Sequence, residues 1–185
     1  MAVVLRQSAR MRELIDDLMD LAQIESGAVD LSPEAVPLRQ LLAEVATDLS
    51  AAASARGVDV VVAGDEALMV QGDRRRLGQI ARNLLDNAIK FSPEGATVEV
   101  QVERAAAGPS FCVTDRGAGI PRSERDKIFQ RFYQIDRSRS KTRPGTGLGL
   151  AIVKHLVHLH GATVEVEGEP GLGSTFRVQF PSVPV

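Results

Sequence analysis

The chain has 185 residues, of which 22 are Lys or Arg and 24 are Asp or Glu, so its formal net charge at pH 7 is −2. This balance argues against a protein that coats nucleic acid or an anionic membrane. Apolar residues make up 44% of the chain and aromatic residues 4%, which is typical of a globular core built from aliphatic side chains. Cys112 is the only cysteine, and no apolar run approaches the roughly 18 residues of a membrane span. We therefore expect a soluble protein of a reducing compartment, the cytoplasm, with no membrane contact from this segment.

The first segment has the pattern of one long amphipathic helix, because residues 1–26 contain no Gly or Pro. A narrow apolar seam recurs there at alternating steps of three and four, at Met11, Leu14, Leu18 and Leu21. Gly27 can cap the helix, and Pro33 then marks a linker. We predict a first unit over residues 1–30 and a main domain over 31–185. The alternative is that the helix folds back onto the main domain, but its narrow seam favours a partner outside that domain.

The rest of the chain alternates helical patterns with short strands. Apolar spacing of three and four predicts helices over 38–57, 73–92 and 148–160, the second of them capped by Asp73. Alternating or continuous apolar runs predict strands over 58–62, 68–70, 97–102, 110–114, 162–166 and 174–180. The first two strands flank a turn at 63–66, the last two form a hairpin, and the region 121–141 is irregular and charged. This order predicts an α+β protein, a two-layer α/β sandwich preceded by one long amphipathic helix.

Two glycine clusters differ from ordinary turns. Residues 115–120, DRGAGI, follow a predicted strand, and residues 145–150, GTGLGL, lead into a helix. Glycines let backbone N–H groups approach an anion closely, and a helix start adds partial positive charge. The second cluster follows a basic loop rather than a strand, so it does not match the dinucleotide-binding pattern, and the sequence contains no P-loop. The clusters favour a polyphosphate site, with plain turns as the alternative.

A polar helix face is the third indication of a nucleotide site. Asn83, Asn87 and Lys90 lie at i, i+4 and i+7, on one face of the helix predicted over 73–92. Amide oxygens suit a hard cation such as Mg²⁺, and an ammonium group suits phosphate. A solvated polar face would be the ordinary interpretation of these three residues alone. The two glycine clusters downstream make a nucleotide site the favoured one.

In this order the motifs resemble those of the ATP-binding catalytic domain of bacterial sensor histidine kinases, within the superfamily of gyrase, heat-shock chaperone and mismatch-repair ATPases. Residues 83–91 resemble the N box, 115–120 the G1 box, 129–132 the F box and 145–150 the G2 box. Residues 8–26 resemble the second helix of that family's dimerisation and phosphotransfer hairpin. The resemblance implies a mixed sheet of about five strands backed by three helices, with ATP held between the helix layer and a lid.

The resemblance also implies metal and base contacts. Asn87, with Asn83 beside it, would hold Mg²⁺ on the phosphates, and Lys90 would neutralise phosphate oxygens, so these three are the implied catalytic residues. Asp115 would accept a hydrogen bond from the exocyclic amine of adenine. Further implied base contacts are Phe91, the purine space left by Gly117 and Gly119, and an apolar wall at Ile120.

At the triphosphate, the resemblance implies backbone donors from the G2 box: Gly145, Thr146, Gly147, Leu148 and Gly149. Arg131 and Arg143 would reach the phosphates from the lid, and Phe132 is a further candidate contact with a core position as its alternative. A short basic run between 137 and 143 lies in this lid. Because it lacks interleaved aromatic residues, it favours a solvated lid, and we expect no nucleic acid partner.

The three histidines, His155, His158 and His160, all follow the G2 box, and none is followed by the acidic neighbour of the family's acceptor motif. Without a Cys or carboxylate cluster beside them, they favour packing or surface positions over a zinc site. We therefore expect a partial chain, with the acceptor histidine outside it, that does not phosphorylate itself. The resemblance implies a dimeric parent kinase, with an anchor in the inner membrane as an open alternative.

The implied activity is that of a protein-histidine kinase. The chain would bind Mg-ATP and donate the γ-phosphoryl group to a histidine on the parent's hairpin, from which it passes to a response regulator. One alternative is a non-catalytic, nucleotide-responsive dimerisation or scaffold module. Another is a serine kinase or ATPase of the same superfamily, which Asn83 disfavours because the hydrolysing relatives carry a water-activating Glu there.

Overall fold

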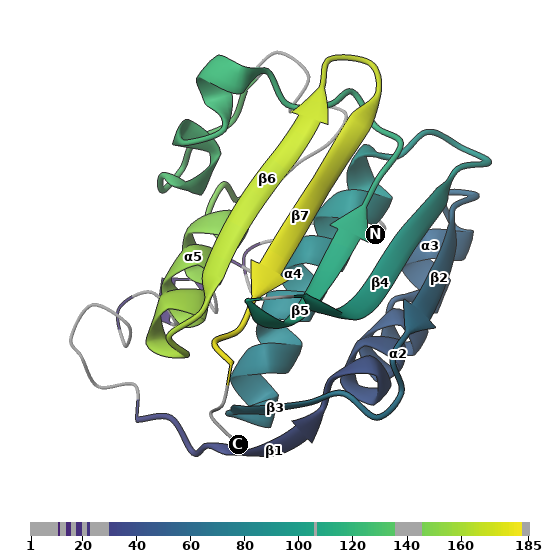
Figure 1. The fold of residues 1–185 in the computed structure, drawn as a ribbon. Helices are drawn as coiled ribbons and strands as arrows, with labels where there is room; N and C mark the ends of the chain where they lie inside the picture. The colour runs from purple at the N-terminus through teal and green to yellow at the C-terminus, as the bar shows by residue number, and fades with distance from the viewer. Residues whose placement is uncertain are drawn as a thin grey trace.

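The computed structural model describes residues 30–105, 107–135 and 146–182, together with positions 11, 14, 15, 18, 19 and 22 (Figure 1). The helices are α2 (Leu38–Asp48), α3 (Ser50–Ser54), α4 (Arg74–Phe91) and α5 (Gly149–Leu159). The strands are β1 (Glu34–Pro37), β2 (Asp59–Gly64), β3 (Met69–Gly72), β4 (Thr97–Ala105), β5 (Gly108–Thr114), β6 (Thr163–Glu169) and β7 (Gly173–Gln179). Two short 3₁₀ helices, η1 (Arg122–Glu124) and η2 (Lys127–Phe129), follow β5.

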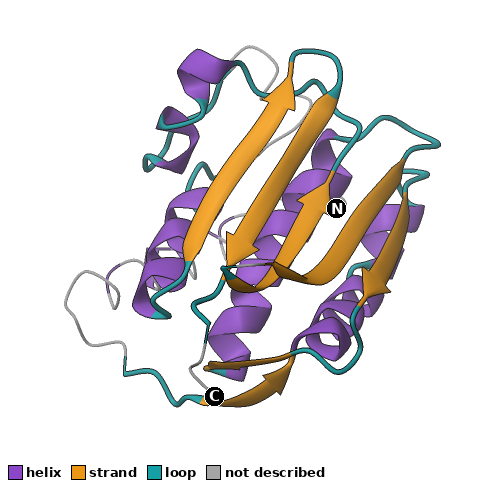
Figure 2. Cartoon of the chain, viewed as in Figure 1, coloured by secondary structure: helices purple, strands orange, loops and turns teal. Residues whose placement is uncertain are grey.

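The main sheet has five strands in the order β2-β4-β5-β7-β6. It is mixed, because β2 pairs with β4 in parallel whereas the other neighbours pair antiparallel. The helices α2, α4 and α5 lie on one face of this sheet, and no helix of the described residues covers the other face (Figure 2). The prediction of an α+β protein with two layers and a mixed sheet backed by three helices is thereby confirmed.

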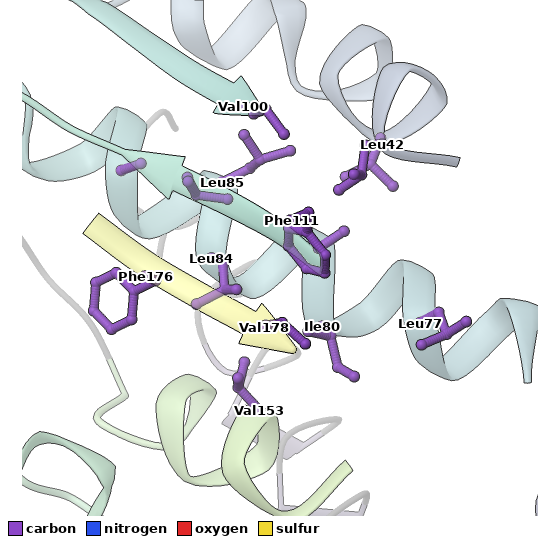
Figure 3. Close-up of a cluster of buried hydrophobic side chains, with 14 of the residues drawn as sticks. Leu42, Leu77, Ile80, Leu84, Leu85, Val100, Phe111, Val153, Phe176 and Val178 are labelled. Carbon is purple, nitrogen blue, oxygen red and sulfur yellow. The ribbon is translucent and has the colours of Figure 1, made fainter. Parts of the chain in front are cut away.

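The core lies between the helices and the sheet. On α4, Leu84, Leu85 and Ile89 are at most 2% exposed, as its apolar spacing predicts. They belong to one core cluster with Phe111 of β5 and Phe176 of β7, and Figure 3 shows Leu84 and Leu85 pointing toward these strands. This packing fixes which face of α4 points away from the sheet core.

Asp73 caps α4, as predicted. Its Oδ1 accepts from the backbone N–H of Arg76 at 3.0 Å, and its Oδ2 accepts from the backbone N–H of Ser32 at 3.1 Å. These two bonds lower the pKa of the Asp73 carboxyl, although burial raises it. The cap therefore joins the start of α4 to the segment that leads into β1.

Two predictions of local structure were wrong, the linker and the unbroken helix over 38–57, and the pairing of the strands beside the turn at 63–66 was not predicted. The Pro-rich segment expected as a linker contains β1, which pairs antiparallel with β3 in a separate two-stranded sheet. The strands expected on either side of the turn at 63–66 do not pair, since β2 joins β4 and β3 joins β1. The helix expected over 38–57 is divided at Leu49, whose φ of −90° and ψ of 0° lie in the bridge region. Leu49 remains buried, so core packing continues across this division.

The described positions of the first segment are helical. Met11, Ile15, Leu18 and Met19 are 46–63% exposed, so these apolar side chains of the predicted seam region do not join the described core. Leu21, the last residue of the predicted seam, lies outside the described residues. Over the described part of the chain, no helix combines the length and apolarity needed to cross a bilayer. The boundary between residues 30 and 31 stays a prediction.

Candidate functional site

The polar face of α4 forms one wall of the candidate site. The side chains of this face, Asn83, Asn87 and Lys90, are half-buried, whereas the neighbouring leucines are fully buried. The predicted separation of a polar face from an apolar face is therefore present. Asn83 Nδ2 donates to the carbonyl oxygen of Gly149 at 3.3 Å. This bond joins the N box directly to the G2 box, because Gly149 is the first residue of α5.

The end of α4 is held by a side chain from outside the helix. Arg56 Nε donates to the carbonyl oxygen of Ile89 at 3.1 Å, and its Nη2 donates to that of Lys90 at 2.7 Å. Carbonyl groups of the last helical turn have no partner within the helix, so a cation there complements both the hydrogen bonding and the helix dipole. Arg56 thereby fixes the backbone that carries Lys90 and the 44% exposed Phe91.

Asp115 lies immediately after β5 and is only 6% exposed. Its Oδ1 accepts from the backbone N–H of Gly117 at 2.7 Å, and its own N–H donates to the Ser174 carbonyl at 2.8 Å. Burial raises the pKa of the Asp115 carboxyl, and hydrogen bonds from Gly117 and Ser174 partly oppose that rise. A buried carboxyl held in this way is suited to accept from an amine of a bound base.

The two glycines of the G1 box are required by close backbone contacts. A Cβ on Gly117 would lie 2.7 Å from Asp115 Oδ1 and 2.8 Å from the carbonyl oxygen of Phe91. Gly119 has φ of +72°, and a Cβ there would overlap the carbonyl oxygen of Glu169. These contacts explain why both positions require glycine, and the predicted contact of the two glycines with a purine stays a prediction. Ile120, the predicted apolar wall, is 9% exposed and belongs to the core cluster.

The described part of the G2 box turns sharply into α5. Gly147 has φ of +73°, Leu148 is fully buried, and the backbone N–H of Leu148 donates to Thr146 Oγ1 at 3.1 Å. The buried Leu148 anchors the loop, so that the N-terminus of an 11-residue helix follows it directly. Gly145, Arg143 and the basic run at 137–143 lie outside the described residues.

The F box contacts the G2 box through Phe132. The backbone N–H of Phe132 donates to the carbonyl oxygen of Gly147 at 2.9 Å, and a Cβ on Gly147 would lie 2.9 Å from the Cα of Phe132. Phe132 has φ of +59° and is 54% exposed, so it does not occupy the alternative core position. Phe129 is instead half-buried against Phe176, with their ring centroids 6.4 Å apart.

Arg131 lines a surface groove of about 670 Å³ beside α5, together with Lys154 and His155. None of the other predicted site residues that the structure describes lines this groove or a second one of about 790 Å³ between α2 and α4. Among the described residues, no group of three His, Cys, Asp or Glu side chains is arranged to hold a metal. His160 accepts from the backbone N–H of Asp73 at 3.1 Å and contacts the carbonyl oxygen of Leu156 at 2.7 Å, which makes it a packing residue.

The sequence pattern missed one part of the site, the turn between β6 and β7. The backbone N–H of Gly171 donates to the carbonyl oxygen of Ala118 at 2.7 Å, and Glu169 contacts Gly119. Gly168, Gly171 and Gly173 all have positive φ, an unusual concentration for one hairpin turn. That concentration of glycines was the available signal for a turn shaped to fit the G1 box.

Comparison with known proteins gives consistent matches. The family described as "Histidine kinase-, DNA gyrase B-, and HSP90-like ATPase" matches residues 72–184. The chain is 39% identical to the circadian input-output histidine kinase CikA of Synechococcus elongatus, covering 91% of this chain and 23% of that protein. It is 32% identical to the sensor-like histidine kinase SenX3 of Mycolicibacterium smegmatis, covering 96% of this chain and 46% of that protein.

Two solved structures are similar over most of the described fold. The crystal structure of full-length ShkA in complex with AMPPNP matches 99% of this chain and 39% of that one, with a TM-score of 0.84 and 32% identity. The mycobacterial sensor histidine kinase MprB matches 83% of this chain and 99% of that one, with a TM-score of 0.72 and 31% identity. The chain thus spans less than half the length of the curated relatives CikA and SenX3.

Proposed function

We propose, from the premise that the chain belongs to the histidine kinase-, DNA gyrase B- and HSP90-like ATPase family, that it binds Mg-ATP between α4 and the loops of its G1 and G2 boxes. The sequence-based assignment to this superfamily is confirmed by the family match and by the similarity to sensor histidine kinases. The single observation that carries the proposal is the convergence of motifs from four separate segments.

Each motif contacts another in the folded chain. Asn83 of the N box donates to Gly149 of the G2 box, and Gly117 of the G1 box lies against Phe91 at the end of the N box. Phe132 of the F box donates to Gly147 of the G2 box. Plain turns and a solvated helix face would not require these segments to meet, so their convergence supports one shared ligand site.

The residues fit the parts of Mg-ATP in different ways. The Asp115 carboxyl is suited to the adenine amine, and the start of α5 is suited to the phosphate groups. The amide oxygens of Asn83 and Asn87 are hard ligands of the type that Mg²⁺ accepts, and Lys90 follows on the same face. When bound, Mg²⁺ would supply neutralising charge to the phosphate oxygens.

The activity we propose is transfer of the γ-phosphoryl group to a histidine of a sensor kinase hairpin. Such a transfer depends on positioning and charge neutralisation, which backbone donors, amides and one ammonium group can provide without an internal nucleophile. We infer that the hairpin, a second protomer and a response regulator are the partners in the whole protein. The relatives CikA and SenX3 are named as histidine kinases, which supports a histidine as the acceptor of the phosphoryl group.

Hydrolysis of ATP to release free phosphate is less well supported. Asn83 carries no carboxylate, and its amide is engaged with Gly149. Asp86, three residues later, is exposed on another side of α4. A general base for water is therefore missing from this position of the N box, which favours transfer to a separate acceptor.

A transfer assay tests the proposal. The chain is mixed with Mg-ATP and a separately purified, histidine-bearing hairpin of a relative such as SenX3, and acid-labile phosphate on the hairpin is measured. We expect transfer with the wild-type chain and loss of transfer with Asn87→Ala. ATP binding without transfer would favour the scaffold alternative, and steady phosphate release without the hairpin would favour the ATPase alternative.

A further inference from the structure

A hydrogen bond from the side chain of Arg125 joins the region between the G1 and F boxes to the main sheet. Arg125 follows η1, and its Nη2 donates to the carbonyl oxygen of Gly168 at 2.6 Å. Gly168 belongs to β6, which is the edge strand of the sheet. Carbonyl groups on the outer side of an edge strand have no ladder partner, so the Arg125 guanidinium fills a position that another strand would otherwise take.

The same end of β6 also holds the G1 box. Immediately after Gly168, Glu169 contacts Gly119, and Gly171 donates to Ala118. The segment from Ala118 to Arg125 is therefore joined to the β6–β7 turn at both of its ends. In Figure 1 this green segment lies at the same end of the sheet as that turn.

A second set of contacts continues from Arg125 toward the G2 box. Glu124, the residue before Arg125, accepts a short hydrogen bond from the Tyr133 hydroxyl and a hydrogen bond from Lys127 Nζ at 3.2 Å. Next to Tyr133, the backbone N–H of Phe132 donates to Gly147. A continuous series of contacts thus links the Asp115 loop, the β6–β7 turn, the F box and the G2 box.

We propose that Arg125 is a positioning residue: it holds the base-binding loop of the G1 box in a fixed position relative to the G2 box. It thereby sets the preference for adenine nucleotides. The inference rests on the proposed function of this site. Arg125 acts through its hydrogen bond to the Gly168 carbonyl. Its effect on the ligand passes through Asp115, which Ser174 of the same hairpin also holds in place by accepting its backbone N–H.

The Arg125 side chain is half-buried, and the burial of its Nε supports a role in positioning. Its Nε is buried and has no hydrogen-bond partner among the described residues, whereas its Nη2 has one. Burying an N–H group without a partner costs free energy, so another interaction of the Arg125 side chain has to offset that cost. The charge-assisted bond to Gly168 is what keeps the guanidinium in this position.

The predicted consequence concerns base selectivity. Asp115 can distinguish adenine from guanine because a carboxylate accepts from the adenine amine but is repelled by the guanine carbonyl at the same ring position. If the G1 loop loses its attachment to the β6–β7 turn, the Asp115 carboxylate loses its fixed position. The difference in affinity between adenine and guanine nucleotides then becomes smaller. Binding of a guanine nucleotide, which gains nothing from Asp115, should change less.

Calorimetric titration with AMPPNP and its guanine counterpart GMPPNP, both with Mg²⁺, tests this inference on the full chain. We expect Arg125→Met, which keeps much of the side-chain volume, to weaken AMPPNP binding by about tenfold, the size of one lost charge-assisted hydrogen bond. The ratio of GMPPNP to AMPPNP dissociation constants should fall. Arg125→Lys should recover part of both effects. Arg177→Ala, which removes an exposed ion pair with Glu103, is the matched control and should leave the ratio unchanged.

The outcomes separate the two proposals. Thermal unfolding of each variant shows whether it folds. If Arg125→Met unfolds at a lower temperature but keeps the wild-type affinity and base ratio, Arg125 is only a structural link and the inference is wrong. If the wild-type chain binds neither nucleotide, the proposed function is wrong and this inference falls with it.

Discussion

At the scale of single residues, Asp115 has opposing effects on binding and on folding. Burial raises the pKa of its carboxyl in the folded chain, despite hydrogen bonds from Gly117 and Ser174. The folded state therefore holds this proton more tightly than the unfolded state does. It follows that the free energy of unfolding decreases as pH rises from the ordinary pKa of an aspartate through the raised pKa of Asp115.

Replacing Asp115 by Asn should separate these two effects. The amide oxygen still accepts from Gly117, but no buried charge forms, so we expect equal or greater stability at pH 7 and a flatter dependence on pH across that window. Nucleotide binding should weaken by at least about tenfold, because the charged acceptor for the adenine amine is lost. Urea unfolding between pH 4 and 8 and titration with AMPPNP check the prediction; a variant less stable than wild type at pH 7 would contradict it.

Gly119 and Gly171 form a matched pair for testing close packing between the G1 box and the β6–β7 turn. Both have positive φ, but a Cβ on Gly119 would overlap the Glu169 carbonyl oxygen, whereas a Cβ on Gly171 would meet nothing within 4 Å. We expect Gly171→Ala to cost about 1–2 kcal/mol of stability from backbone strain alone. Gly119→Ala should cost at least about 3 kcal/mol, because strain and overlap add. If urea unfolding shows that the two variants lose the same stability, the β6–β7 turn does not pack closely against the G1 box.

Some residue-level features could be read from sequence and others could not. The face shared by Asn83, Asn87 and Lys90 follows from helical periodicity, which is local. The left-handed conformation of Phe132 has no such signal, because residues other than Gly and Asn rarely adopt it. It is set by the hydrogen bond to Gly147, which is distant in sequence.

At the scale of elements, the carboxyl end of α4 depends on Arg56, which is bonded to the carbonyl groups of Ile89 and Lys90. We expect Arg56→Ala to reduce the free energy of unfolding by about 1–2 kcal/mol, since two helix-end carbonyls lose a cationic partner. It should also weaken AMPPNP binding severalfold, because the backbone that carries Lys90 and Phe91 is loosened.

Arg82→Ala is the control for this prediction, since it removes an exposed pair with Asp48 from the middle of the same helix. Its cost in thermal or urea unfolding should stay below about 0.5 kcal/mol. If both variants lose the same stability and neither loses affinity, the Arg56 cap has no part in shaping the site.

Elements stabilised by nearby residues were predictable, whereas distant pairings were not. The bounds of α4, α5 and the β6–β7 hairpin follow closely from spacing, the Asp73 cap and turn residues. The β1–β3 pair joins residues more than thirty positions apart, and Pro33 beside it indicated a linker instead. The parallel β2–β4 pair likewise depends on α4 crossing between them, a relation that short-range patterns do not contain.

At the scale of the whole molecule, the candidate site is assembled from separate segments that lie between Asn83 and Ser174 in the sequence. Among the described residues, the hydrogen bond from Asn83 to Gly149 joins α4 to α5, and the hydrogen bond from Phe132 to Gly147 joins the F box to the G2 box. A ligand that touches all of these segments would add links between them without displacing the core. Its binding free energy should then appear as stability of the entire domain.

Thermal unfolding with nucleotide measures this coupling. With Mg-AMPPNP at about 100 times its dissociation constant, we expect stabilisation of about 2.7 kcal/mol, which corresponds to a rise in Tm of roughly 5–10 °C for a domain of this size. Chelating Mg²⁺ should remove most of the rise, because the phosphates then lose the cation that Asn83 and Asn87 would help to hold. Asn87→Ala should leave the Tm of the free protein nearly unchanged, since Asn87 is only half-buried, and should abolish the rise. A rise that persists in Asn87→Ala, or that is independent of Mg²⁺, would remove Asn87 from the metal site and require another cation to neutralise the phosphates.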